Sequence, residues 1–236
     1  MNRLFLFLLV CLTACQNQDS SDSDTIPTPD ESLEQATIAP VGKEDTIQFN
    51  KGIKNQYEGP ERFIWQKPEM IIDLIGDLED KVIADIGAGT GYFALPMTSK
   101  AKKVIAIDID PRFINYLDSV KVLELPENLQ ERLETRLAEP NDPNLKKGEA
   151  DVVIIVNTFM YIQNKVAYLR NLKQGIAENG RLLIIDFKRK RTSIGPPSKI
   201  RTPLFEVEEA LYKAGYSSIN TNDTALNYQY IVLAEK

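Results

Sequence analysis

The residues best suited to chemistry form a glycine-rich segment, ADIGAGTGYFA, at residues 84–94. An aspartate precedes three alternating glycines: Asp85, Gly87, Gly89 and Gly91. Glycines allow a tight turn and a close approach of the backbone to a ligand. A second carboxylate, Asp108, ends the next apolar run, 21 residues after Gly87. Because a carboxylate can accept charge-assisted bonds from both ribose hydroxyls, the segment predicts a nucleotide or nucleoside site.

Two phosphate-binding interpretations fail on one residue. A P-loop requires Lys and Ser or Thr directly after its glycines, but Tyr92 follows Gly91. The dinucleotide fingerprint G-x-G-x-x-G, counted from Gly87, requires its third glycine where Tyr92 stands. The pattern that remains is acidic-x-Gly-x-Gly-x-Gly.

The elements that must position these residues alternate between apolar runs and amphipathic helices. Short apolar runs predict strands at 81–87, 103–110, 151–157, 181–187, 217–221 and 228–235, with a further strand before residue 138. Amphipathic spacing predicts helices at 67–78, 92–101, 111–123, 165–180 and 204–216. In the first of these helices the spacing places one residue set inward: Met70, Ile71, Leu74, Ile75 and Leu78. In the helix at 111–123 the inward set is Phe113, Ile114 and Leu117.

This alternation predicts an α/β, Rossmann-like fold. It has a central, mostly parallel seven-stranded sheet with helices on both faces. Only a short polar connection separates the last two strands, which requires an antiparallel C-terminal strand.

The glycine triplet, the two acids and the order of elements together resemble the class I S-adenosylmethionine-dependent methyltransferases, over roughly residues 60–236. The resemblance implies S-adenosyl-L-methionine as cofactor, with the turn Gly87, Ala88, Gly89 and Gly91 against its amino-acid end. Asp108 would bind the ribose, and Ile109 would pack on the adenine. Asp85 would orient the turn or reach the ammonium group through water; a simple capping role on the turn is the alternative.

Other segments add candidate cofactor contacts by the same resemblance. In AEPNDPNL, residues 138–145, Asn141 or Asp142 would read the adenine amino group, unless the segment is only a proline-rich turn. GPERFIWQKPEMI, residues 59–71, resembles the entry segment of a subgroup of predicted bacterial lipoprotein methyltransferases. There Trp65 would cover the sulfonium side of the pocket, or else be a core aromatic residue.

The predicted acceptor side departs from this subgroup. Its fourth strand often ends in a V-D-x-Y-H type sequence, but here the stretch is VNTFMYI, so Asn157 stands for the acid and Met160 for the histidine. Asn157 remains a candidate cofactor contact. The catalytic residue is unknown: Tyr161 is a weak candidate and is better explained as an aromatic wall, since a phenol loses its proton only near pH ~10.

Two functions follow. The first is methyl transfer to a small-molecule acceptor, for which a soft acceptor such as a thiol would need little help from a base. The alternative is a non-catalytic S-adenosylmethionine- or nucleoside-binding protein on the same scaffold. The segment KRKRTSIGPPSKIRT, residues 188–202, should form a loop or lid over the acceptor side, either attracting an acidic substrate or simply solvated.

Composition excludes several kinds of site. The chain has 236 residues, no histidine and two cysteines, so we expect no metal centre. A net charge of −6 argues against nucleic-acid binding, which needs clustered cations. We expect a monomer with 43% hydrophobic residues supporting one domain.

The N-terminus predicts export. Residues 1–15, MNRLFLFLLVCLTAC, have a cation, a short apolar run and small residues before Cys15, which resembles a bacterial lipoprotein signal lipidated on Cys15. A polar, disordered linker at 16–45 would connect this anchor to a methyltransferase-like domain at 46–236. The expected location is the bacterial cell envelope, with the protein lipid-anchored to the membrane and facing the periplasm or the surface. S-adenosylmethionine is made in the cytoplasm, so the predicted cofactor and the predicted location are in tension.

Overall fold

The computed structural model describes residue 52, residues 58–59 and residues 61–236. The predicted signal peptide (1–15) and the linker (16–45) lie outside the described residues. The described residues belong to one compact unit, Gly42–Lys236. Among them, no helix has the length and apolar character needed to cross a membrane.

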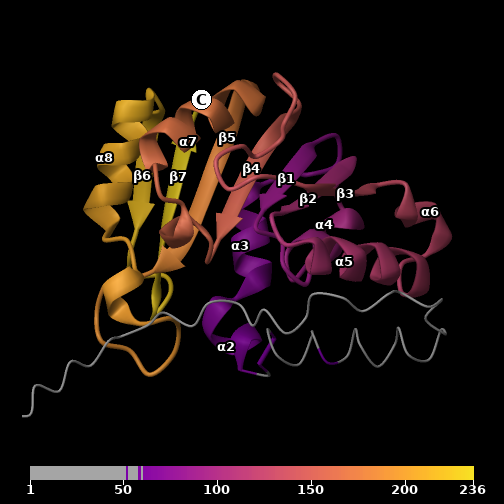
Figure 1. Cartoon of the computed structure of the whole chain (residues 1–236), viewed down its shortest axis with the longest axis horizontal. Coiled ribbons are helices and arrows are strands. Elements are labelled where there is room, and N and C mark those ends of the chain that lie inside the picture. The colour runs from indigo at the N-terminus through magenta and orange to yellow at the C-terminus, as the bar shows by residue number, and fades with distance from the viewer. Residues whose placement is uncertain (1–51, 53–57, 60) are drawn as a thin grey trace, which may run out of the picture. The chain divides into compact units, whose positions relative to one another are not determined.

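A seven-stranded sheet in the order β3-β2-β1-β4-β5-β7-β6 forms the centre of this unit (Figure 1). The strands are β1 (Val82–Ile86), β2 (Lys103–Asp108), β3 (Leu133–Leu137), β4 (Ala150–Val156), β5 (Ile176–Phe187), β6 (Ser217–Asn222) and β7 (Gln229–Glu235). The first five strands pair in parallel, and β7 lies antiparallel to both β5 and β6. The predicted fold class is therefore confirmed.

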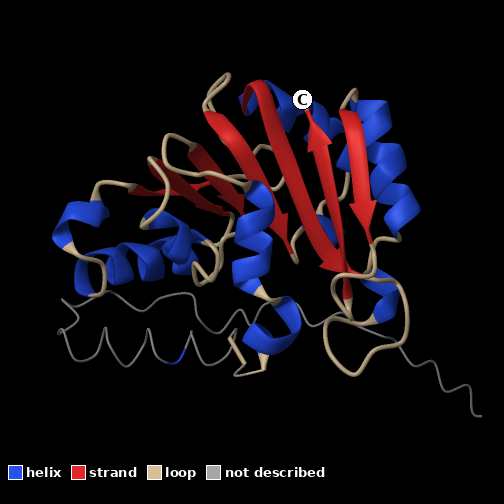
Figure 2. Cartoon of the chain, turned by 180° about the vertical axis from the view of Figure 1, so that it is seen from behind, coloured by secondary structure: helices blue, strands red, loops and turns tan. Residues whose placement is uncertain are grey.

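Helices cover both faces of the sheet (Figure 2). They are α2 (Arg62–Gln66), α3 (Pro68–Ile75), α4 (Ala94–Thr98), α5 (Pro111–Leu123), α6 (Glu127–Gln130), α7 (Lys165–Gly175) and α8 (Leu204–Ala214), with short 3-10 turns η2 (Phe159–Tyr161) and η3 (Ser198–Ile200). One apolar cluster joins α3, α4 and α5 to one face of the sheet, and a second joins α7 and α8 to the other. Because β1 and β4 are buried on both faces, they are apolar except for Asp85 in β1 and Asp151 in β4.

Two helices have different inward faces from those predicted. In α3 the buried set is Ile71, Ile72 and Ile75, while Leu74 is exposed. The helix ends at Ile75 because Gly76 takes a positive φ of 87°, so the buried Leu78 belongs to the following turn. In α5 the buried residues are Tyr116, Leu117 and Val120, and Phe113 and Ile114 are only half-buried.

The helix predicted at 165–180 ends earlier than expected. Helix α7 stops at Gly175, and β5 begins at the next residue. A Cβ at Gly175 would lie 2.6 Å from the Cβ of Leu145, so close packing requires glycine there. Ile176 then pairs with Ala150 of β4. The strand pairing therefore overrides the turn signal of Asn179 and Gly180.

Candidate functional site

A cavity of about 490 Å³ opens at the carboxyl ends of β1, β2 and β4. In an open α/β sheet this end, where strand order reverses, is the expected ligand site. Eight predicted site residues line the cavity: Trp65, Gly87, Ala88, Gly89, Asp108, Ile109, Asn157 and Tyr161. Four others are outside its lining: Asp85, Gly91, Asn141 and Asp142.

The glycine turn is closed by backbone hydrogen bonds to β2. The N–H groups of Gly87 and Ala88 both donate to the carbonyl of Ile107, at 2.8 and 3.0 Å. All three glycines have positive φ (73°, 54° and 79°), a region that disfavours side chains. Their surroundings differ, so the three glycines do not share one role.

Of the three glycines in the turn, only Gly89 faces open space. A Cβ on Gly89 would meet no atom within 4 Å, whereas one on Gly87 would overlap the side chain of Thr158. A Cβ on Gly91 would lie 2.7 Å from Cδ2 of Leu117. Gly89 therefore permits close approach of a ligand, and Gly87 and Gly91 permit close packing of the protein on itself.

Asp108 joins the turn to the end of β2. Its Oδ2 accepts from the N–H of Gly89 at 2.9 Å, and its Oδ1 accepts from the N–H of Asp110 at 3.0 Å. Burial raises the pKa of this carboxyl group, against the opposing effect of these backbone donors. The carboxylate is thus held at the cavity wall with lone pairs left for a ligand.

Asp85 lies behind the turn instead of in the cavity wall. It is almost wholly buried in β1, and burial, followed by repulsion from Asp108, raises its pKa to about 7. Arg62 and the backbone N–H of Ala94 oppose this shift. This position agrees with a role in orienting the turn and the start of α4.

In the segment after β3, the residues that line the cavity are not the predicted Asn141 and Asp142. Ala138, Glu139 and Pro140 line the cavity, because Glu139 and Asp142 close a short backbone bridge that turns the chain away after Pro140. Oδ1 of Asp142 accepts from the N–H of Asn144 at 2.9 Å, so this side chain is engaged in the turn.

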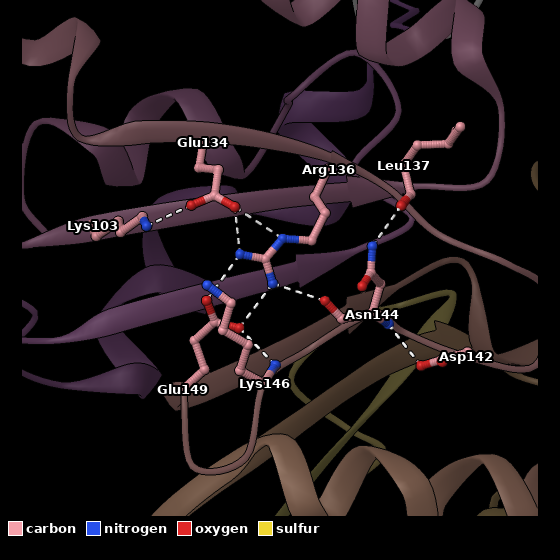
Figure 3. Close-up of polar contacts among 8 residues, drawn as sticks. All are labelled: Lys103, Glu134, Arg136, Leu137, Asp142, Asn144, Lys146 and Glu149. Carbon is pink, nitrogen blue, oxygen red and sulfur yellow. Dashed lines mark hydrogen bonds and ion pairs between the residues drawn. The ribbon is translucent and has the colours of Figure 1, made fainter.

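Charged side chains hold this segment in place (Figure 3). Arg136 donates to Glu134, to Glu149 and to the carbonyl of Asn144. The Arg136 hydrogen bonds lower the pKa of Glu149 to about 2. Nδ2 of Asn144 donates to the carbonyl of Leu137 at 3.0 Å. The wall of the cavity after β3 is therefore fixed by a network distant in sequence from the glycine turn.

Helix α2 forms another wall. Trp65 lines the cavity and packs at 5.6 Å from Phe187 and 6.4 Å from Tyr228, measured between ring centroids. It is half-buried, so it is both packed and accessible to the cavity. Arg62 also lines the cavity, stacks 3.9 Å over the ring of Tyr92 and donates to Oε1 of Gln66 at 2.6 Å.

The end of β4 contributes the amide side chain of Asn157. Asn157 has φ 58° and its Oδ1 accepts from Nε2 of the fully buried Gln229. Met160 is buried and is not part of the cavity lining. Tyr161 lines the cavity from η2, and burial raises its pKa.

Asp186 supports η2 from beneath. Its Oδ2 accepts from the N–H of Met160 and its Oδ1 from the N–H of Phe187, both at 2.8 Å. It has no exposed surface, and burial raises its pKa to about 7. This carboxyl group is a buried support for η2 and Tyr161, since it does not line the cavity.

The segment 188–202 is a fixed loop. The buried Arg201 donates to the carbonyls of Lys188, Lys190, Ile194 and Pro196. A Cβ on Gly195 would overlap the ring of Phe187, so the loop lies tightly over that ring.

Sequence reasoning missed several residues that line the cavity: Arg62, Phe113, Glu139, Pro140, Thr158 and Tyr168. The cation of Arg62, three residues before Trp65, was the detectable signal. The other missed residues reach the cavity through paths of the loops that the sequence pattern does not predict. Among the described residues, no group of three or more Cys, Asp or Glu side chains could hold a metal ion.

Comparison with known proteins agrees with this geometry. A family described as methyltransferase domain matches residues 84–182. A solved S-adenosylmethionine-dependent methyltransferase from Aquifex aeolicus is 25% identical with a TM-score of 0.70, covering 79% of this chain and 97% of that one. Phosphoethanolamine N-methyltransferase 2 from Haemonchus contortus, solved with S-adenosyl-L-methionine, has a TM-score of 0.63 at 13% identity, covering 83% of this chain and 57% of that one.

Curated relatives match over shorter segments. The ubiquinone biosynthesis O-methyltransferase of Rickettsia typhi is 27% identical over 160 residues, which is 66% of this chain and 58% of that protein. The matched segments span 20% to 58% of the lengths of the four curated relatives.

Residues 84–182 therefore match the methyltransferase domain family, and the fold is similar to that of solved S-adenosylmethionine-dependent methyltransferases. S-adenosyl-L-methionine is the cofactor that the domain match and the fold imply, and the Haemonchus contortus enzyme was solved with it bound.

The buried acids predict a pH dependence of stability. The pKa values of Asp85 and Asp186, each about 7 when folded, exceed the ordinary value of about 4. The folded protein therefore retains protons that the unfolded chain has released, and the free energy of unfolding should fall as pH rises from about 5 to about 7, by up to about 1.4 kcal/mol per pH unit for each group. Urea unfolding across this range should show a shallower fall in Asp85→Asn.

Asp80→Asn is the matched control, because it removes an exposed carboxyl group from the turn before β1. An equal change of slope in both variants would contradict the assignment to Asp85.

Proposed function

We propose that this protein transfers a methyl group from S-adenosyl-L-methionine to a small-molecule acceptor. The observation that carries the proposal is the pairing of Gly89 and Asp108 at the cavity wall. The backbone of Gly89 is open to a ligand, and the carboxylate of Asp108 is held beside it by a hydrogen bond from the N–H of Gly89. The fold and the domain match support the same activity.

The residues present fit this cofactor. The open space at Gly89 admits a ligand against the backbone, and the cavity of about 490 Å³ falls within the range usual for small-molecule sites. Two buried polar atoms beside Arg62, Nε2 of Gln66 and the hydroxyl of Tyr92, have no hydrogen-bond partner among the described groups. Unsatisfied buried donors are costly, but neither residue lines the cavity, so the fit depends on Gly89, Asp108 and the cavity itself.

Each wall would take one part of the cofactor. Asp108 would accept from the ribose hydroxyls, and Ile109, which is exposed at the mouth, would pack on the adenine together with Phe113. Glu139 and Pro140 would replace Asn141 and Asp142 beside the adenine edge. Asn141 and Asp142 remain the second candidates for the adenine contact, because they follow Pro140, which lines the cavity.

The cation of Arg62 would attract the carboxylate end, and Trp65 would cover the sulfonium side. Burial lowers the pKa of Arg62, but the guanidinium stays charged at neutral pH. Gly87, Ala88 and Gly91 would act by holding the turn, and Asp85 by orienting it from behind.

The chemistry supplied by the bound cofactor is an electrophilic methyl group on a sulfonium. The chain's task is then mainly to align an acceptor with that group. The acceptor half of the cavity has Asn157, Thr158 and Tyr161 but no histidine. This set suits a soft acceptor such as a thiol, which ionises near pH ~8.5 without a protein base.

Cofactor binding tests the first half of the proposal. Calorimetry of the chain from residue 42 onward should show binding of S-adenosylmethionine or S-adenosylhomocysteine. Asp108→Asn should weaken binding at least about tenfold, since charge-assisted hydrogen bonds contribute roughly 1.5–3 kcal/mol.

Asp118→Asn, at an exposed position on α5, is the matched control and should leave affinity unchanged. Circular dichroism must show that both variants fold. Unchanged affinity in folded Asp108→Asn would remove the ribose assignment.

Turnover tests the second half. With 2-mercaptoethanol as acceptor, S-adenosylhomocysteine should form at a rate that follows ionisation of the thiol as pH rises. Tyr161→Phe should change kcat less than about tenfold, because a wall residue lacks the roughly 10²–10⁴-fold effect of a general base.

The matched control is Tyr212→Phe, which removes the hydroxyl group of an exposed tyrosine on α8. A loss of a hundredfold or more in Tyr161→Phe alone would instead assign Tyr161 as the base. Cofactor binding without turnover on any acceptor would favour the non-catalytic alternative.

We also propose that the protein is exported and anchored through lipid on Cys15. The support is the sequence of residues 1–15 alone, which ends in small residues before the cysteine. Cells fed radioactive palmitate should label the wild type and Cys11→Ala but not Cys15→Ala. Labelling that persists in Cys15→Ala would overturn the anchor.

A further inference from the structure

We propose that one surface of the protein docks on anionic phospholipid membranes. It consists of four cations and four apolar residues: Arg189, Lys190, Arg191, Lys199, Phe63, Ile64, Ile200 and Phe205. We call this set the basic-apolar patch. The inference goes beyond methyl transfer and does not depend on it.

The apolar members are large side chains left in solvent. Phe63 and Ile64 of α2 are 58% and 72% exposed, and Phe205, at the start of α8, is 60% exposed. Ile200 of η3 is 39% exposed. Single exposed apolar residues need no explanation. Here Ile200 and Phe205 adjoin the loop that carries the cations in the sequence, and Phe63 and Ile64 belong to the helix that packs on Phe187, as the loop does.

The cations are concentrated in one loop. Residues 188–201 contain six of the chain's 28 Lys and Arg residues and no Asp or Glu, although the whole chain has a net charge of −6. Arg201 is buried, and Nζ of Lys188 donates to backbone carbonyls. The other four are exposed. Among the described residues, Arg189 forms a long ion pair, 3.9 Å, with Glu206.

The loop is rigid enough to present these charges together. Four carbonyls of the loop accept from Arg201, whose guanidinium lies 5.1 Å from the ring of Phe187. Trp65 of α2 packs on the same ring. Phe187 therefore holds α2 and the loop side by side, at the end of the sheet where β4 and β5 terminate (Figure 1).

An anionic bilayer matches this combination better than a soluble acidic substrate. The four cations are not part of the cavity lining, so they are poorly placed to bind a substrate there. Apolar side chains beside cations are the features that bind an interface, because the former enter the headgroup region and the latter attract acidic lipids. Since Arg62 and Trp65 of α2 line the cavity, docking would bring its mouth close to the lipid surface.

Vesicle binding tests the proposal. The chain from residue 42 onward contains both core clusters, whose members all lie between Met70 and Ala234, and lacks the predicted lipid. It should sediment with vesicles in which about a third of the lipid is phosphatidylserine, and not with pure phosphatidylcholine. The variant R189Q/K190Q/R191Q/K199Q should bind at least about tenfold more weakly. Phe63→Ser/Ile64→Ser should also weaken binding several-fold.

Matched controls remove the same groups elsewhere on the surface. K100Q/K102Q/K146Q/K147Q deletes four exposed lysines, and Val122→Ser/Leu137→Ser deletes two exposed apolar side chains. Both controls should bind like the parent chain. Circular dichroism shows whether each variant still folds, and calorimetry with S-adenosylmethionine shows separately whether it binds the cofactor.

Three outcomes would contradict the proposal that the basic-apolar patch docks on membranes. They are no binding of the parent chain to acidic vesicles, equal losses in the patch and control variants, and a serine pair that leaves binding unchanged. None of these outcomes bears on the cofactor site, and loss of cofactor binding bears only on the proposed function.

Discussion

The hydrogen bonds between the glycine turn and the end of β2 are the interaction on which the site depends. The carbonyl of Ile107 accepts from two turn amides, and the carboxylate of Asp108 accepts from a third, that of Gly89. These bonds satisfy backbone groups that would otherwise be unpaired at the entrance to the core. They also align the open face of Gly89 with the carboxylate, so the fold and the ligand site share the same bonds.

Buried carboxyl groups support the cavity from behind. Asp85 in β1 lies under the turn, and Asp186 at the end of β5 holds the backbone of η2. Both are disfavoured as anions by burial, and this costs stability at neutral pH. Strongly shifted pKa values of this kind are concentrated at functional sites.

Much of the fold was predictable because its signals are local. Continuous apolar runs indicated buried strands, and proline and glycine indicated helix boundaries, as at Pro111 and Gly215. Predictions failed where partners distant in sequence decided the outcome. In α3, packing buries Ile72 and leaves Leu74 exposed, and α7 ends at Gly175 because Ile176 pairs with Ala150 of β4.

The sequence by itself determined the type of site: the spacing of Asp85, the three glycines and Asp108 favours a nucleoside over a phosphate, and Tyr92 excludes both phosphate motifs. Only the tertiary structure decided which residues reach the cavity. It placed Glu139 and Pro140 in the wall instead of Asn141 and Asp142, because the Arg136 network fixes the path of that loop. It also brought Arg62 to the cavity. Helix α2 and the loop at residues 188–202 both pack on Phe187, a contact that the local sequence does not encode.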